Sequence, residues 1–441
     1  MKAKITLWYN NHRNGINTSK FTFLSFVLLV IVWLVDIRYP DLNKSIPEFF
    51  LLTKDVSKSF LSNLSGVFLT VTTFTLTTIL TVLTTYASNF TPRVVQKFID
   101  KPHVLSLIGV FVGGFFYTVL SLLIIQDVAE DQKLLAGTLG IIYAILSMVY
   151  FMKFVHKVLY SIKEVNVIQD VYEEAEKLIQ EESDLRKEST RYLEEEIQSG
   201  FPIYSLETGY FYDLNEDDLL KVLTKYPCEL VTKVKIGEYV LKDMEIAEIH
   251  SKKEKNLPQG QDRKDWLDAI AKTFLLNPAK NDQADYHHEI TNLVEIALRA
   301  ISPGINDPNT AINCIGKICN LLGQLFSTKN NFILLKSQDD ANVVYVAYSV
   351  EEELYLTFYQ LIHYGKEDPS IAKTILEGIL HMYIQADGEV KTSIASYYHD
   401  CYQVFYDSLT SKRDREKIQD LYQDFKKQEG KNLGNPPLNR G

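Results

Sequence analysis

Long apolar runs fill the first third of the chain. Four of them are long enough to cross a hydrocarbon core of about 30 Å as helices that rise about 1.5 Å per residue. They cover residues 21–37, 60–87, 104–125 and 134–154. Arg38-Tyr39-Pro40-Asp41 follows the first run without a small-residue cleavage site, so we expect that run to be retained. The pattern predicts a transmembrane domain over residues 1–154.

Basic residues flank these runs unevenly. They are Lys2, Lys4, Arg13 and Lys20 before the first run, Arg93, Lys97 and Lys101 between the second and third, and Lys153, Lys157 and Lys163 after the fourth. Cytoplasmic flanks of membrane spans carry an excess of Lys and Arg. We therefore expect both the N-terminus and the C-terminus to be cytoplasmic.

A different pattern follows the spans. Residues 155–198 have helical spacing with many charges, which predicts one long connecting helix. Residues 199–250 predict a small β-rich module, with strands at 201–206, 210–212, 229–234 and 237–249 around a helix at 215–225. In this module we expect Gly237 to turn the chain and Val240, Met244, Ile246 and Ile249 to lie inside.

The last region, residues 251–429, is predicted to be mostly helical. It opens with a polar surface linker over residues 251–265. The helices are expected at 266–276, 284–301, 350–364, 369–385, 389–410 and 413–427, with a β-hairpin near 332–347 and a disordered tail at 430–441. The fold class is therefore an α-helical integral membrane protein with four transmembrane helices and an α+β cytoplasmic domain.

The second span is unusual because threonine dominates it. Projected at about 100° per residue, one stripe of threonines lies along a single helix face. The stripe is formed by Thr70, Thr73, Thr77, Thr81 and Thr84. One interpretation is a tolerated helix whose hydroxyls bond its own carbonyls. The other is that the stripe lines a water-filled path, since polar residues in spans face bundle interiors or cavities.

Two further features belong to the membrane region. Gly109-x-x-x-Gly113 in the third span and Ala136, Gly140 and Ala144 in the fourth provide small faces for close helix approach, within one bundle or between subunits. Thr91-Pro92 predicts the start of a short helix after the second span. Arg93 would then contact lipid headgroups, or alternatively act in gating.

The segment from Ala297 to Ala311 joins two predicted helices. Ser302-Pro303-Gly304 ends the first, with Gly304 permitting a left-handed turn, and Asp307 and Pro308 suit the start of the second. We interpret the segment as a braced corner. A ligand contact is the alternative, because amides at a helix start beside a basic residue attract anions. The candidate residues are Arg299, Ser302, Asn306, Asp307 and Thr310.

Charge and cysteine usage narrow the function. The formal net charge is -10, and most of the acidic excess follows the spans. A nucleic-acid partner is not expected, because phosphate binding needs clustered Lys and Arg. Cys228, Cys314, Cys319 and Cys401 lack metal-site spacing, so we expect reduced core thiols.

The sequence contains no complete set of catalytic or metal-binding residues that matches a known motif. His287 and His288 are adjacent, so on a helix they diverge by about 100° and cannot share one metal ion; we expect surface or boundary histidines. The chain has no H-E-x-x-H, phosphate loop, G-x-S-x-G, dinucleotide fingerprint or kinase motif. We therefore expect no metal, no cofactor and no enzymatic activity.

Three segments together resemble a known family. They are A-L-R-A-I-S-P-G-I-N-D-P-N-T-A at residues 297–311, G-Y-F-Y-D-L at residues 209–214 and N-F-T-P-R at residues 89–93. This combination resembles the bacterial family of predicted membrane proteins catalogued as domain of unknown function 2254. The resemblance implies a multi-span inner-membrane protein with a cytoplasmic domain, and it implies no settled activity.

The sequence leaves two main hypotheses of function. The first is an oligomeric membrane protein, a homo-oligomer in the lipid bilayer, whose second span lines a conduit for ions or small solutes and whose cytoplasmic domain gates it. The second is a non-conducting sensor or scaffold, anchored by its spans, that binds a cytoplasmic ligand or protein. Enzymatic action on a membrane substrate is the third and least supported hypothesis.

Overall fold

The computed structural model describes residues 2–89, 95, 102–130, 132–161, 163–189, 200–226, 228–251, 257–278, 285–328, 331–336 and 341–433. The chain divides into two compact units. We call Met1–Val167 the membrane unit and Ile168–Gly441 the α/β unit, and each is described by itself.

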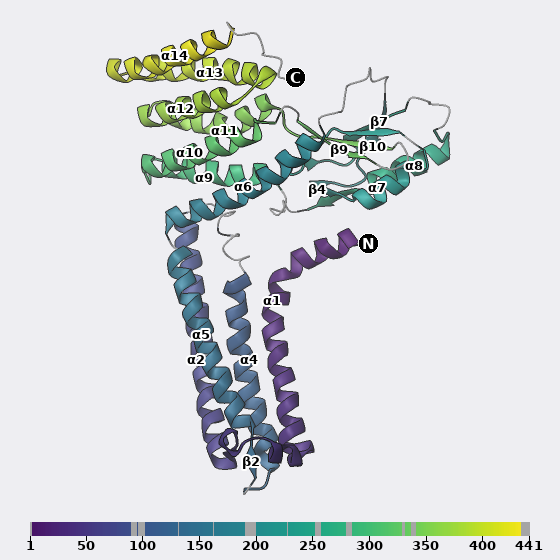
Figure 1. Cartoon of the computed structure of the whole chain (residues 1–441), viewed down its shortest axis with the longest axis vertical. Coiled ribbons are helices and arrows are strands. Elements are labelled where there is room, and N and C mark those ends of the chain that lie inside the picture. Colours follow the sequence, from purple (N-terminus) through teal and green to yellow (C-terminus); the bar gives the residue numbers. More distant parts are fainter. Residues whose placement is uncertain are drawn as a thin grey trace, which may run out of the picture. The chain divides into compact units, whose positions relative to one another are not determined.

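In its described residues, the membrane unit contains a bundle of four long helices (Figure 1). They are α1 (Lys2–Trp33), α2 (Lys54–Asn89), α4 (Pro102–Ile124) and α5 (Ala136–Ser161). Within the described residues, four helical segments are long and apolar enough to cross a membrane: Ser19–Arg38, Lys54–Ala87, Ser106–Asp127 and Ala136–Tyr160. These segments and the separate α/β unit confirm the predicted fold class.

Small residues let the bundle helices approach closely. A Cβ atom added to Gly114 of α4 would lie 2.7 Å from the Phe68 ring of α2. One added to Gly137 of α5 would lie 2.8 Å from the Ser57 hydroxyl of α2. Real Cβ contacts are not that short, so glycine is needed at both places. On the predicted small faces, a Cβ added to Gly113 would overlap the Ser25 hydroxyl of α1, and one added to Gly140 would lie 2.9 Å from Leu61 of α2, so these faces serve packing inside one bundle.

A buried carboxylate closes one end of the bundle. Asp36 lies in a short π-helix, η1 (Leu34–Arg38), and is only 1% exposed. Its two oxygens accept hydrogen bonds from the backbone amides of Leu135 and Ala136, both at 2.9 Å. Amides at the start of a helix have no partner within it, so Asp36 satisfies those at the start of α5. Nearby, β1 (Leu52–Thr53) pairs with β2 (Lys133–Leu134), and short 3-10 turns occupy Pro40–Ser45, Glu48–Phe50 and Ile125–Asp127.

The prediction of a single connecting helix is wrong, because the helix is interrupted. Instead of one helix from residue 155 onward, α5 continues to Ser161 and a separate helix, α6, spans Glu164–Glu188. Residues 190–198 of the predicted helix lie outside the described residues. The Asn166 side chain donates a hydrogen bond of 2.7 Å to the Tyr160 carbonyl. This side-chain bond replaces a backbone bond of a continuous helix and restarts the chain, although neither Pro nor Gly is present.

Two small sheets form the β-rich part of the α/β unit. The described strands are β3 (Phe201–Tyr204), β4 (Gly209–Leu214), β5 (Glu229–Thr232), β6 (Tyr239–Val240), β7 (Glu245–His250), β8 (Phe274–Asn277), β9 (Phe332–Lys336) and β10 (Asn342–Val346). One sheet has the order β3-β7-β5-β10-β9 and the other β6-β4-β8. The predicted hairpin of β9 and β10 is confirmed, but it also joins the module because β10 pairs in parallel with β5.

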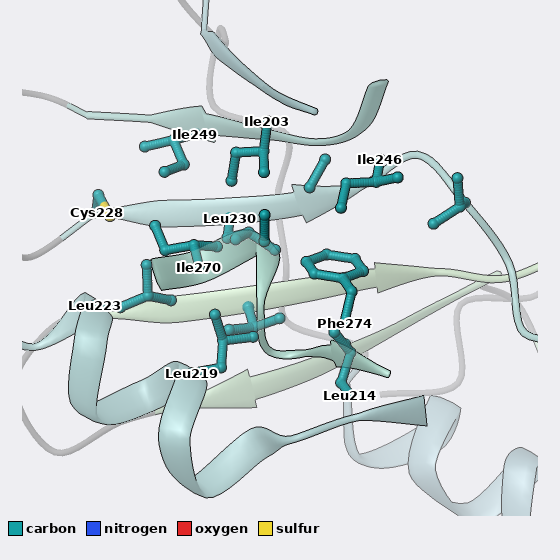
Figure 2. Packing of buried hydrophobic residues seen from close by; sticks show 14 of the residues in the cluster. Ile203, Leu214, Leu219, Leu223, Cys228, Leu230, Ile246, Ile249, Ile270 and Phe274 are labelled. Atoms are coloured by element: carbon teal, nitrogen blue, oxygen red, sulfur yellow. The ribbon is translucent and has the colours of Figure 1, made fainter. Parts of the chain in front are cut away.

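An apolar core fills the β-rich part (Figure 2). Ile203, Leu230, Ile246 and Ile249 contribute from the strands of the five-stranded sheet, with Phe274 from β8. Helices α7 (Glu216–Leu223) and α8 (Gln261–Ala271) add Leu219, Leu223 and Ile270. The core therefore joins residues more than 100 positions apart, since Val343 of β10 belongs to the same cluster.

Three predictions for this module need correction. The helix predicted at 266–276 ends at Ala271, and its last residues form β8, which pairs with β4. The predicted linker is partly structured, because Leu257 is buried and α8 begins at Gln261. Met244 is 40% exposed, although Val240, Ile246 and Ile249 are buried as predicted. Asp243 has a φ of 64°, and this left-handed residue breaks the strand alternation just before Met244.

After α6 and the β-rich part, six more helices complete the described part of the α/β unit and lie stacked beside one another (Figure 1). They are α9 (Tyr286–Ala300), α10 (Pro308–Leu325), α11 (Val350–Gly365), α12 (Pro369–Gln385), α13 (Gly388–Ser408) and α14 (Lys412–Leu433). α10 packs against α9 and α12, and α12 packs against α13 and α14. α14 extends four residues into the predicted disordered tail, of which residues 434–441 lie outside the described residues.

Candidate functional site

The threonine stripe of α2 points away from the bundle of its own chain. Thr70, Thr73, Thr77, Thr81 and Thr84 are all exposed. The buried residues of the same helix are Ser57, Leu61, Phe68, Thr75, Ile79, Val82 and Tyr86. At about 100° per residue, the centres of the two sets lie about 180° apart around the helix axis. The stripe is therefore opposite the face that packs against α4 and α5.

Every hydroxyl of the stripe is bonded within its own helix. The acceptor is the carbonyl four residues earlier, at 2.8 Å for Thr70, 3.1 Å for Thr73, 3.0 Å for Thr77 and 2.9 Å for Thr81 and Thr84. This geometry satisfies the one donor that each hydroxyl has. It agrees with an internally satisfied helix, and it leaves one side of each oxygen facing outward.

The polar face is longer than the threonines alone indicate. Ser59, Ser62, Asn63 and Gly66 are exposed and fall within the same band, about 100° wide at the helical repeat of 100° per residue. Asp55, in the first turn of α2, lies on the same band. We call this set, from Asp55 to Thr84, the polar stripe. The helical period, applied from residue 55 onward, predicts this set from the sequence.

Exposed apolar residues border the polar stripe on both sides. Val56, Phe60, Val67 and Phe74 lie along one border, and Leu69, Leu76 and Leu80 lie along the other. A lone span in lipid has no need of a polar band between apolar borders. A helix that lines a water-filled path needs a polar band toward the water. Its apolar borders can then pack against neighbouring copies.

The predicted corner has its candidate residues close together. Asp307 is the N-cap of α10, and its carboxylate accepts from the Thr310 amide at 3.2 Å and from the Thr310 hydroxyl at 2.6 Å. These hydrogen bonds lower the pKa of the Asp307 carboxyl. The Ser302 hydroxyl donates to the Arg299 carbonyl at 2.6 Å. Asn306 adopts the left-handed conformation with a φ of 52°, a role that the sequence had given to Gly304.

The bonds at this corner favour architecture over ligand binding. Both Asp307 oxygens are used in capping, and the Asp307 amide donates to the Ala300 carbonyl at 2.8 Å, which ties the start of α10 to the end of α9. A negative carboxylate at this position also disfavours an anion. Arg93, the remaining candidate, lies outside the described residues together with Thr91 and Pro92.

A buried polar network in the α/β unit was missed by the sequence analysis. Arg186 of α6 is only 4% exposed; it donates to Glu182 at 2.9 Å and to the Tyr286 hydroxyl at 3.1 Å. Tyr286 in turn donates to Glu353 of α11 at 2.7 Å. The second oxygen of Glu353 lies 2.9 Å from Nδ1 of His287. The network joins the end of α6 to the first turns of α9 and α11.

Burial and charge explain why this network holds together. Glu353 has no exposed side-chain surface, and a buried carboxylate is stable only with partners. Burial, and secondarily the charge of Glu353, raises the pKa of Tyr286 well above its usual value, so the phenol stays protonated and donates. The prediction of surface or boundary histidines is wrong for His288, which is 1% exposed, whereas His287 is half-buried, a boundary position, and is bonded to Glu353.

The network continues toward the β-rich part of the unit. The His287 ring stacks on Tyr348 with 4.7 Å between ring centroids. The Lys235 ammonium lies 4.6 Å from the centroid of the same Tyr348 ring and 2.6 Å from a Glu352 oxygen. Cations over aromatic faces and charge-assisted hydrogen bonds both stabilise such junctions. Lys235 thus links the loop after β5 to the start of α11.

Three polar contacts join α6 to α10 along their lengths. Lys317 donates to Gln169 at 2.7 Å, Asn320 to Tyr172 at 2.7 Å and Gln324 to Glu176 at 3.1 Å. Each pair is separated by 148 positions in sequence, so the two helices run in the same direction with constant register. The part of α6 within the α/β unit is therefore held to the helical stack over several turns.

The cysteines are buried free thiols, as predicted. Burial raises the pKa of Cys228, Cys319 and Cys401 to about 12, which makes them unreactive at neutral pH. In the part of the chain that the structure describes, no group of three or more His, Cys, Asp or Glu could hold a metal ion.

Four apolar helices with a separate α/β unit define a multi-span membrane protein. The chain belongs to the family of predicted membrane proteins catalogued as domain of unknown function 2254, whose model matches residues 18–380. This confirms the resemblance drawn from the three sequence segments.

The relatives that the chain matches carry the description uncharacterized protein. The chain is 23% identical over 329 residues to an uncharacterized protein of Mycobacterium bovis and, to the same extent, to one of Mycobacterium tuberculosis. Each match covers 71% of this chain and 62% of the relative. The chain thus spans less than two thirds of the length of these relatives. No solved structure matches it.

Proposed function

We propose that this protein is a homo-oligomeric conduit for ions or small solutes, lined by the polar stripe of α2. The observation that carries the proposal is the direction of the stripe, opposite the packed face of α2. In a single copy the stripe faces outward, where lipid offers Asn63 and the serines no hydrogen-bonding partner. Several copies that turn their stripes toward a common axis would give those groups water.

The same arrangement gives the apolar borders a role. Helices that meet around an axis touch along the two edges of the face that lines the path. In the oligomer, Phe74 on one border would pack against Leu76 or Leu80 of a neighbouring copy. We place both termini, and the α/β unit, on the cytoplasmic side of the bacterial inner membrane, following the distribution of Lys and Arg.

The α/β unit would regulate the conduit in this proposal. α6 begins three residues after the end of α5 in the chain. Its hydrogen bonds to α10 and its tie to Tyr286 through Arg186 fix it to the helical stack. A change in the stack would therefore move α6, and α6 would pass the movement to the last span.

The test is solute flux into liposomes that contain the purified protein. Thr73→Leu and Thr77→Leu should each reduce flux strongly, because leucine removes water-facing oxygen and adds volume. Thr78→Leu and Thr85→Leu are matched controls: both residues make the same i-4 hydrogen bond, but they lie outside the polar stripe. These controls should retain most of the flux.

Two results would contradict the conduit. One is a correctly assembled protein that passes no ion or small solute. The other is equal loss in the stripe and control variants, which would point to a packing defect. If flux is absent and a defined soluble protein or ligand binds the α/β unit, the sensor or scaffold hypothesis replaces the conduit.

A further inference from the structure

The hydrogen bonds of the threonines in the polar stripe determine whether the stripe favours a positively or a negatively charged solute. A threonine hydroxyl has one hydrogen and two lone pairs. In all five threonines of the stripe that hydrogen points to the carbonyl four residues earlier. The group left for a passing solute is the hydroxyl oxygen, which accepts and does not donate.

The threonine part of the stripe, whose hydroxyls only accept, suits cations. Oxygen ligands replace the hydration shell of a cation, whereas an anion needs N–H or O–H donors. Rotating a threonine hydroxyl toward an anion would cost the hydrogen bond within the helix. The other donors of the stripe, on Ser59, Ser62 and the Asn63 amide, lie together toward its Asp55 end.

The charge at one end of the stripe has the matching sign. Asp55 is exposed and lies on the line of Thr73 around the helix axis. The two nearby bases lie elsewhere. Lys54 donates to the carbonyls of Gln126 at 3.0 Å and Val128 at 2.5 Å, and Lys58 falls about 60° to one side of Asp55 at the helical repeat. No basic residue occurs within the stripe from Asp55 to Thr84.

We propose that the conduit is selective for small inorganic cations, with a ring of Asp55 carboxylates at its mouth and threonine oxygens along its length. This inference rests on the proposed function of the polar stripe. In an oligomer each copy contributes one Asp55, and a ring of carboxylates concentrates cations and repels anions at the entrance.

Asp55 also has an ordinary structural role that must be separated from selectivity. A carboxylate in the first turn stabilises its helix through the helix dipole. That role affects stability and assembly, and it does not distinguish K⁺ from Cl⁻. The ratio of cation to anion permeability is therefore the measurement that isolates the proposed role.

The experiment is a reversal-potential measurement on the full-length protein in planar bilayers, under a KCl gradient. The wild-type protein should reverse near the K⁺ equilibrium potential. Asp55→Asn should move the reversal potential toward zero and reduce cation current severalfold, and Lys58→Gln should leave the preference for cations in place. Thr73→Val and Thr77→Val, which keep the shape and remove the oxygen, should lower K⁺ conductance.

The outcomes separate this inference from the proposed function. No current from assembled wild-type protein overturns both. A current that reverses near zero, or near the Cl⁻ potential, overturns cation selectivity and leaves the conduit standing. An Asp55→Asn current with unchanged selectivity overturns the carboxylate ring, and unchanged conductance in both valine variants overturns the role of the threonine oxygens.

Discussion

Asp307 holds the start of α10 through two hydrogen bonds to Thr310. The sequence predicted this cap, because Asp before Pro308 at a helix start is a favoured combination. It could not predict that the left-handed residue would be Asn306, since both glycine and asparagine tolerate that conformation. At this scale, short-range rules fix the chemistry of the corner, and neighbouring helices fix the backbone angles.

Replacing Asp307 tests the corner as architecture. Asp307→Ala should lower the free energy of unfolding by about 1 kcal/mol, because the cap is lost, whereas Asp307→Asn should retain most of the stability. Chemical denaturation of the full-length protein in detergent measures both. An Asp307→Ala protein of unchanged stability but lost flux would show instead that the corner has a direct functional role.

Because Asp307 is titratable, its contribution to stability should depend on pH. The folded pKa of Asp307 is lowered by Thr310, so its contribution to stability is present above the unfolded pKa of about 3.9 and is lost as the pH falls through the folded pKa. The wild-type protein and Asp307→Asn should therefore converge in stability as the pH is lowered below about 4. A difference between them that stays constant down to acid pH would contradict the role of the charge.

α6 is the element for which tertiary contacts matter most. Its amphipathic pattern was visible in the sequence, including the apolar positions Val171, Ala175 and Ile179 that are now buried. In the sequence, Arg186 is one of many charged residues between positions 155 and 198. Its burial follows from the approach of Tyr286 and Glu353, which are 100 and 167 positions away, and helical periodicity carries no signal over such distances.

Replacing Arg186 should lower the free energy of unfolding substantially. Arg186→Met removes the positive charge that reaches the buried Glu353 through Tyr286 and breaks the ion pair with the half-buried Glu182, and we expect a loss of about 3–5 kcal/mol in the stability of the protein. Lys187→Met, on the exposed side of α6, should change stability by less than about 0.5 kcal/mol. Adding Glu353→Gln to Arg186→Met should recover part of the loss, because one buried charge is removed. Thermal unfolding of the three variants measures this, and equal effects of the two single changes would contradict the network.

At the scale of the whole molecule, the direction of the polar stripe implies that one copy is incomplete. The four-helix bundle packs well on its own, through Gly114 and Gly137 among others. The polar stripe lies on the outer surface of this bundle. A path lined by the stripe therefore requires further copies of the chain. Oligomerisation is thus a condition of the proposed function and can be tested without measuring flux.

Disulfide cross-linking in membranes tests the assembly. Cysteines introduced singly at Thr70, Thr73 or Thr77 should form dimers between copies on mild oxidation, because these positions would face one another. Cysteines at Thr72 or Ile79, which lie on the packed side of α2 about 140–160° from the centre of the stripe, are the controls and should cross-link less. The native cysteines are buried with raised thiol pKa values, so their background is low. Efficient cross-linking at the controls but not at the stripe would place a different face of α2 at the subunit interface.

Local pattern by itself determined the four spans, the threonine stripe, the hairpin and the helix caps, because each depends on residues a few positions apart. The tertiary structure decided the rest. It showed that the stripe lies opposite the packed face of α2, that residues 274–277 form a strand with a partner in β4, and that Arg186, Tyr286 and Glu353 meet. A sequence period defines the face of a helix, but only the packed chain shows what that face meets.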